Sequence, residues 1–133
     1  EEFYVKVPVT WGALKVISDL VRSGVKVNAT AITHSIQGVL AYQAGAQILS
    51  FFWGKMTDQG IDPGNHVKSC RDYLASNGGS ARILVGSFRQ TETVSLAFAS
   101  GAHICTLPYQ ILVKSANKLQ SEEAVAIFLD SNF

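Results

Sequence analysis

The chain has 133 residues, of which 47% are hydrophobic and 16% charged, and its formal net charge is +1. This is enough apolar chain for one domain with a hydrophobic core, and too little charge for a disordered tail or a nucleic-acid-binding surface. No apolar run reaches the roughly 18 residues of a membrane span. We therefore expect neither a nucleic-acid partner nor a membrane partner.

Two cysteines, Cys70 and Cys105, lie far apart in apolar patterns. We interpret both as buried, reduced thiols, which are typical of a cytoplasmic protein. The only methionine is Met56, and the chain does not begin with one. We therefore expect the sequence to be part of a longer translated chain.

The first half of the chain predicts strands that alternate with helices. Residues 3–9 alternate between apolar and polar side chains as a strand does, and Thr10 is a suitable N-cap for the next helix. A second strand is predicted at residues 25–30. A helix at residues 35–44 then leads to a third strand at residues 47–53.

The second half continues the alternation. A polar loop at residues 58–64 precedes a helix, and the fourth strand, residues 82–88, is almost continuously hydrophobic. Such a run is typical of a strand that is buried on both faces. Thr91 is the expected cap of a short helix, and the fifth strand is predicted at residues 103–106.

Beyond Pro108 the pattern indicates one or two helices, in which Val125, Ile127 and Phe128 are the expected apolar contacts. Strands that are each followed by a helix predict an α/β fold with parallel strands. Two architectures fit, a doubly wound sheet or a (β/α)8 barrel, and no glycine-rich phosphate fingerprint supports the nucleotide-binding version. A closed barrel usually needs about 250 residues, so the barrel requires a preceding N-terminal portion.

The first strand carries a candidate reactive group. Successive side chains of a strand point to opposite faces, so Val5, Val7 and Val9 share an apolar face and Lys6 lies on the other. An enclosed ammonium is costly, and an enclosed lysine therefore becomes an amine nucleophile. If this strand instead lies at the edge of the sheet, Lys6 stands in water.

Reactive groups of a barrel lie at the C-terminal ends of its strands. In this chain these ends carry an amine, an amide, hydroxyls and cations, namely Lys6, Asn28, Thr30, Ser50, Ser87 and Arg89, with Lys55 just beyond the third strand. Such a set suits Schiff-base chemistry on a phosphorylated carbonyl compound. The three histidines have no metal-ligand spacing, so no bound metal is expected.

The chain contains several short motifs in a fixed order, which are Val5-Lys6-Val7-Pro8-Val9-Thr10, Asn28-Ala29-Thr30-Ala31, Ser50-Phe51-Phe52-Trp53-Gly54-Lys55, Gly86-Ser87-Phe88-Arg89 and Thr106-Leu107-Pro108. Together they resemble the transaldolase family, and their spacing is most similar to its shorter fructose-6-phosphate aldolase-like members. The resemblance covers residues 1–133 as a single α/β unit. It implies a class I aldolase (β/α)8 barrel, of which this chain supplies about five βα units, strands four to eight.

The resemblance also implies roles for individual residues. Lys6 matches the Schiff-base lysine, Asn28 an asparagine that contacts the substrate, and Thr30 a threonine that helps to place the catalytic water. Ser87 and Arg89 match phosphate-binding positions. No cofactor is implied.

Phe52 matches a position that is typically Phe in transaldolases and Tyr in the fructose-6-phosphate aldolases, and Ser50 shares its strand face. Lys55 stands where the family usually has a phosphate-binding arginine. The bidentate contact of a guanidinium with phosphate is therefore replaced by the single charge of an ammonium group. The family's strand-one aspartate and its strand-three acid or amide partner would precede residue 1. The isolated chain is therefore expected to be inactive.

These observations predict a transaldolase-like enzyme that needs no cofactor and transfers a dihydroxyacetone unit between sugar phosphates. One alternative is a fructose-6-phosphate aldolase that releases dihydroxyacetone. Another is that the chain is an inactive, sugar-phosphate-binding half-barrel. Exposed parallel edge strands invite pairing, so a homo-oligomer is expected.

Overall fold

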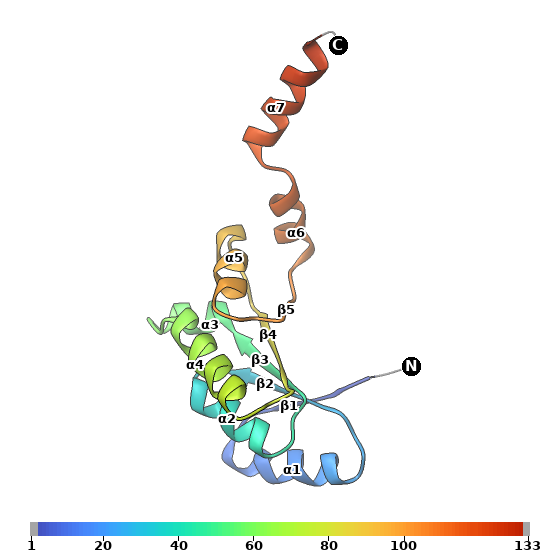
Figure 1. Ribbon diagram of the computed structural model, residues 1–133, viewed down its shortest axis with the longest axis vertical. Helices are drawn as coiled ribbons and strands as arrows, with labels where there is room; N and C mark the ends of the chain where they lie inside the picture. The colour runs from blue at the N-terminus through green and yellow to red at the C-terminus, as the bar shows by residue number, and fades with distance from the viewer. Residues whose placement is uncertain (1–2, 132–133) are drawn as a thin grey trace.

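A computed structural model describes residues 3–131, in which five strands form one sheet in the order of the chain (Figure 1). Each neighbouring pair of strands is parallel, as the alternation with helices predicted. The predicted strands are confirmed, although each is shorter than expected or shifted by a few residues. Their bounds are β1 Val5–Pro8, β2 Val27–Ile32, β3 Ile48–Phe52, β4 Arg82–Gly86 and β5 Ile104–Cys105.

Helices connect successive strands and continue after the last one. The sequence left open whether one or two helices follow β5, and the structure has two. It also contains a short helix, α3, that the sequence did not predict, because β3 turns directly into it at Phe52. The helices are α1 Trp11–Arg22, α2 Ser35–Gln43, α3 Trp53–Asp58, α4 Pro63–Ser76, α5 Thr91–Ala99, α6 Tyr109–Ala116 and α7 Leu119–Asp130.

The first residues of two helices show how local chemistry places their ends. Thr10 caps α1, since its side-chain oxygen accepts a hydrogen bond from the N–H of Ala13 at 3.3 Å. The expectation that Thr91 caps α5 is wrong. Gln90 occupies the cap position, and the Thr91 hydroxyl instead donates to the carboxylate of Glu92 at 2.6 Å.

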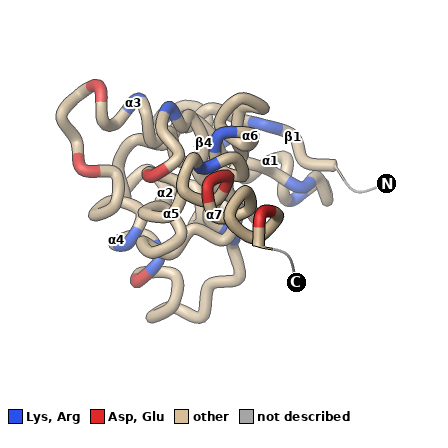
Figure 2. The backbone as a smooth tube through the Cα atoms, turned by 90° about the horizontal axis from the view of Figure 1, so that it is seen from above, with Lys and Arg blue, Asp and Glu red and all other residues tan. Residues whose placement is uncertain are grey.

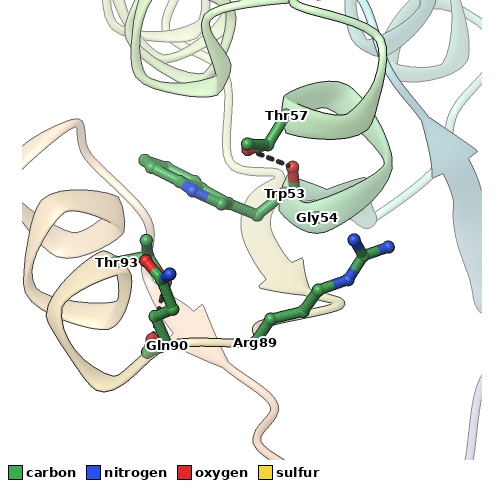
Figure 3. Close-up of a pocket in the computed structure, with 6 residues that line it drawn as sticks. All are labelled: Trp53, Gly54, Thr57, Arg89, Gln90 and Thr93. Carbon is green, nitrogen blue, oxygen red and sulfur yellow. Dashed lines mark hydrogen bonds between the residues drawn. The ribbon is translucent and has the colours of Figure 1, made fainter.

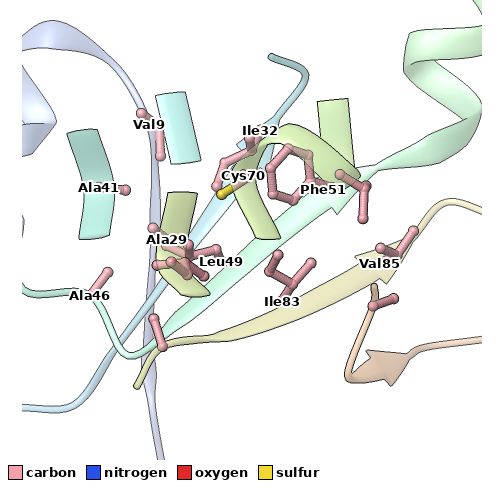
Figure 4. Packing of buried hydrophobic residues seen from close by; sticks show 14 of the residues in the cluster. Val9, Ala29, Ile32, Ala41, Ala46, Leu49, Phe51, Cys70, Ile83 and Val85 are labelled. Carbon is pink, nitrogen blue, oxygen red and sulfur yellow. The ribbon is translucent and has the colours of Figure 1, made fainter. Parts of the chain in front are cut away.

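One face of the sheet carries the hydrophobic core (Figure 4). Alternate strand residues point into it, and Phe51 is the largest of the fully buried side chains. On the helix side, α2 approaches α4 closely because residue 38 is glycine. A Cβ at Gly38 would lie 2.8 Å from the sulfur of Cys70. The strand residues of this core include Val7, Val27, Ala29, Leu49, Phe51, Ile83 and Val85.

Both cysteines are free. Cys70 is fully buried, as expected, but Cys105 is only half-buried. The difference arises because Cys105 ends β5, the last strand of the sheet, which has a neighbouring strand on one side only.

The helices α6 and α7 run away from the sheet toward the C-terminus (Figure 1). The expectation that α7 makes apolar contacts is wrong for the chain as described. Val125, Ile127 and Phe128 are 55%, 67% and 64% exposed, because no other strand or helix within residues 3–131 lies beside α7.

Along the backbone of the described residues, basic and acidic positions are interspersed, without an extended region of one sign (Figure 2). No helix within residues 3–131 is long and apolar enough to cross a membrane. The same part of the chain holds no group of three or more His, Cys, Asp or Glu side chains that could bind a metal ion.

Candidate active site

The sheet face opposite the core carries the polar side chains that the sequence singled out. Lys6 on β1 is the register partner of Asn28 on β2, and Pro8 is the partner of Thr30 one step further along. Register partners in parallel strands point to the same side of the sheet. Lys6, Asn28 and Thr30 therefore share this face.

Ser50 and Asn28 form a buried hydrogen bond on this face. The Ser50 hydroxyl donates to Oδ1 of Asn28 at 2.6 Å, and the two residues are only 1% and 8% exposed. An amide has one acceptor oxygen and two N–H donors. Because Oδ1 accepts from Ser50, the amide is held in one orientation and its Nδ2 hydrogens remain to donate elsewhere.

Thr30 has a buried hydroxyl with no hydrogen-bond partner among the described residues, and the residue is 6% exposed. An unpaired buried polar group costs roughly 1–3 kcal/mol, so such a hydroxyl is a natural contact for a water or a ligand. The backbone is irregular immediately after it. Ala31 has a left-handed φ of 60°, and the register between β2 and β3 shifts between Ala29 and Ile32.

Lys6 is exposed, because β1 is an edge strand of the five-stranded sheet. Of the two placements of Lys6 that the sequence left open, the edge strand with its lysine in water therefore applies to the chain as described. The apolar side of the same strand is exposed only at its start. Val5, at its start, is 38% exposed, whereas Val9 beyond its end is 8% exposed.

Phe52 ends β3 and serves as the N-cap residue of α3. Its ring is half-buried, its register partner is Gly86, and strand alternation puts it on the face of Ser50. Beyond Ser50, the last side chain of β3 on this face is thus an aromatic ring without a hydroxyl.

The ends of β3 and β4 meet closely at Gly54 and Ser87. The N–H of Gly54 donates to the carbonyl oxygen of Ser87 at 3.0 Å. A Cβ at Gly54 would lie 2.3 Å from that oxygen, 3.0 Å from the Ser87 hydroxyl and 3.2 Å from Nε of Arg89. Only glycine fits here, and the hydroxyl and the guanidinium nitrogen approach the same point.

Ser87 adopts a left-handed backbone conformation, with φ of 64°. This conformation costs a non-glycine residue roughly 1–3 kcal/mol, and such strain clusters at functional sites. It occurs where the chain leaves β4 and turns toward Arg89.

Arg89 forms a bidentate ion pair with Asp58 on α3, in which Nη1 donates to Oδ1 and Nη2 donates to Oδ2. The hydrogen bonds from Arg89 hold the pKa of Asp58 below its ordinary value, and the charges of Arg89 and Lys55 act in the same direction. Lys55, exposed on α3, therefore belongs to the same charged corner. Asp58 was not singled out from the sequence. Its position three residues after Lys55 on one helix is the pattern that could have indicated a charged neighbour.

A pocket of about 180 Å³ lies beside this corner, lined by Trp53, Gly54, Thr57, Arg89, Gln90 and Thr93 (Figure 3). Trp53 is buried and stacks on Phe88, with ring centroids 6.2 Å apart. In Figure 3 the guanidinium of Arg89 points toward α3 and away from the Trp53 ring.

The family model described as transaldolase/fructose-6-phosphate aldolase matches residues 1–132. The chain belongs to this family. Individual relatives have similar levels of identity. A probable transaldolase of Alkaliphilus metalliredigens is 31% identical over 125 residues, which are 94% of this chain and 58% of the relative. A probable fructose-6-phosphate aldolase of Streptococcus pneumoniae is 31% identical over 133 residues, which are 100% of this chain and 60% of the relative.

A probable transaldolase of a Geobacillus species is 32% identical over 125 residues, or 94% of this chain and 59% of the relative. The chain thus spans about 60% of the length of the curated relatives that it matches. Relatives named for either activity match at the same identity, so family membership alone does not separate transfer from cleavage.

In the structure, the residues that were singled out from the sequence form two groups. One group lies on the polar face of β1, β2 and β3, and consists of Lys6, Asn28, Thr30, Ser50 and Phe52. The other lies at the ends of β3 and β4, and consists of Lys55, Ser87 and Arg89, to which the structure adds Asp58 and Gly54.

Proposed function

We propose that the whole protein is a transaldolase in which Lys6 forms a Schiff base with a ketose phosphate. The observation that carries this proposal is the pairing of Lys6 with Asn28 on a sheet face that also holds a buried Ser50 hydroxyl. A primary amine beside fixed amide and hydroxyl groups is the arrangement that imine chemistry on a sugar requires. No cofactor takes part in the proposed reaction.

The amine of Lys6 attacks the ketone carbon of the donor, and loss of water from the carbinolamine gives the imine. Cleavage of the C3–C4 bond releases an aldose phosphate and leaves the three remaining carbons on Lys6 as a dihydroxyacetone enamine. The enamine then adds to the aldehyde carbon of an acceptor aldose phosphate. Water adds to the new imine and releases the ketose product, so that the water lost in the first step is regained.

Asn28 and Thr30 have complementary tasks in this scheme. Since Oδ1 of Asn28 accepts from Ser50, its Nδ2 hydrogens donate to a hydroxyl oxygen of the bound sugar. The unpaired hydroxyl of Thr30 holds the water that exchanges protons with the carbinolamine. Ser50 acts on the bound donor through Asn28, whose amide it orients.

The phosphate group binds at the corner formed by Ser87, Arg89 and Lys55. Support comes from the Gly54 position, where the Ser87 hydroxyl and Nε of Arg89 both lie within about 3 Å of one point. Guanidinium and ammonium groups with a hydroxyl are the donors that phosphate oxygens accept from. The distance between the two groups of residues then sets the chain length of the sugar.

The second candidate activity is aldol cleavage with release of dihydroxyacetone. It requires protonation of the enamine, for which a hydroxyl near the C-terminal end of β3 would be suited. Phe52 has a phenyl ring at this position and cannot orient a water by hydrogen bonding. This favours transfer to an acceptor over release.

We further propose that the five strands are strands four to eight of a (β/α)8 barrel. The parallel order and the polar face opposite the helices fit this architecture, and the curated relatives are longer than this chain. In a closed barrel, further strands would cover β1 and enclose Lys6. The 133-residue chain by itself is therefore proposed to be inactive, and self-association through its open edges stays a prediction.

Borohydride trapping tests the proposal. Fructose 6-phosphate and sodium borohydride are added to the whole protein, and mass spectrometry locates any reduced adduct. We expect an adduct on Lys6, which Lys6→Arg abolishes and Lys15→Arg, a change of an exposed lysine on α1, leaves intact. Absence of the Lys6 adduct from the whole protein would refute the function. Efficient trapping on the 133-residue chain would refute its proposed inactivity.

A further inference from the structure

The paired groups Asp58 and Arg89 suggest a role for a residue that the proposed chemistry does not use. Asp58 lies at the end of α3, and both of its carboxylate oxygens accept from the terminal nitrogens of Arg89. The side chains are 42% and 57% exposed, so neither is held in place by burial. We propose that Asp58 is a positioning residue that fixes the Arg89 guanidinium for a phosphate group bound next to Ser87. This inference rests on the proposed function.

The number of guanidinium donors allows Arg89 to bind two anions at once. A guanidinium has five N–H donors, and Asp58 uses one on each terminal nitrogen. The remaining donors include the Nε hydrogen, and Nε lies 3.2 Å from the Cβ position of Gly54, where the Ser87 hydroxyl also approaches. The Asp58 carboxylate thus occupies the terminal edge of the Arg89 guanidinium, which carries Nη1 and Nη2. The Nε hydrogen remains for phosphate.

Positioning matters here because an arginine in water samples many rotamers. A bidentate partner on a helix removes this freedom before the ligand arrives, so less conformational entropy is lost when phosphate binds. The local charge remains favourable, since Lys55 and Arg89 together outweigh the single carboxylate. A carboxylate that merely competed with phosphate would instead have to leave the guanidinium upon binding.

The test compares Asp58→Asn and Asp58→Ala with the unaltered whole protein. We expect the KM for fructose 6-phosphate and the Kd for inorganic phosphate, measured by calorimetry, to rise about tenfold, with kcat changed less than twofold. Asp72→Asn is the matched control, because Asp72 is also an exposed helical aspartate in an ion pair, with Lys68 on α4. It should leave KM and Kd at their original values.

A double-mutant cycle with Arg89→Ala separates positioning from a general structural role. If Asp58 acts through Arg89, Asp58→Asn raises neither KM nor Kd further once Arg89 is gone. Unchanged phosphate affinity in both Asp58 variants, tighter binding, or an equal loss in the Arg89→Ala background would each overturn the inference. Since the calorimetric Kd requires no turnover, it tests this inference even if Lys6 is not trapped and the proposed function fails.

Discussion

The Ser50 hydroxyl donates a 2.6 Å hydrogen bond to Oδ1 of Asn28 on the polar face of the sheet. Both residues are buried, and Asn28 lies opposite Lys6 in the neighbouring strand. A single hydrogen bond between β2 and β3 therefore orients the amide of the residue that is the register partner of the proposed nucleophile.

Ser50→Ala should destabilise the protein by about 1–3 kcal/mol, because Oδ1 of Asn28 would remain buried without a donor. It should also lower kcat/KM, since the amide would be free to rotate. Urea unfolding and steady-state kinetics of the whole protein measure the two effects. Ser69→Ala, an exposed position on α4, is the control and should change neither. An unfolding free energy equal to that of the unaltered protein would show that the hydrogen bond contributes nothing.

Phe52→Tyr should shift the reaction from transfer to cleavage. The new hydroxyl, at the end of β3 on the face of Ser50, would hold a water that protonates the enamine. Release of dihydroxyacetone without an acceptor should increase, and transfer should decrease. Phe98→Tyr adds the same hydroxyl at a position that is 50% exposed on α5, and should have no effect. If the unaltered protein already releases dihydroxyacetone without an acceptor, the protein is the aldolase.

His103 should make the stability depend on pH. Its Nδ1 accepts from the N–H of Ile83 at 2.9 Å, and burial lowers its pKa from the ordinary value of 6.5, with the charges of Arg71 and Arg82 acting in the same direction. A lowered folded-state pKa means that the unfolded chain binds the proton more readily. His103 therefore makes its full contribution to the free energy of unfolding above about pH 6.5. This contribution is lost as the pH falls through the folded-state pKa.

His103→Asn keeps an acceptor for Ile83 but removes the titrating group. Urea unfolding midpoints from pH 8 to pH 5 should fall less steeply for this variant than for the unaltered protein. A difference between the two proteins that stays constant over the whole range would rule out His103 as the source.

The two thiols should react slowly and in a fixed order. Burial raises the pKa of both Cys70 and Cys105 to about 11, so few thiolates are present near neutral pH. Cys105, half-buried on the edge strand β5, should react with Ellman's reagent before Cys70, which is 0% exposed. Mass spectrometry of partly labelled protein gives the order. Rapid labelling of Cys70 in the folded protein would contradict its burial.

Much of the fold could be predicted from the sequence because helix and strand periodicity are local properties of the chain. Alternation in residues 3–9 already put Lys6 opposite the apolar valines, and the β2 pattern put Asn28 and Thr30 on one face. The short helix α3 was not recognised, since its six residues carry too little periodic signal and follow a hydrophobic strand without a break.

The tertiary structure alone decided three features. The exposure of Lys6 follows from β1 being an edge strand, which depends on which strands are present beside it. The exposure of α7 depends in the same way on the absence of a neighbour among the described residues. The pairing of Asp58 with Arg89 joins residues from separate βα units. Sequence periodicity determines which face of an element is apolar, but contacts between distant residues depend on strand register and loop geometry, which no local pattern specifies.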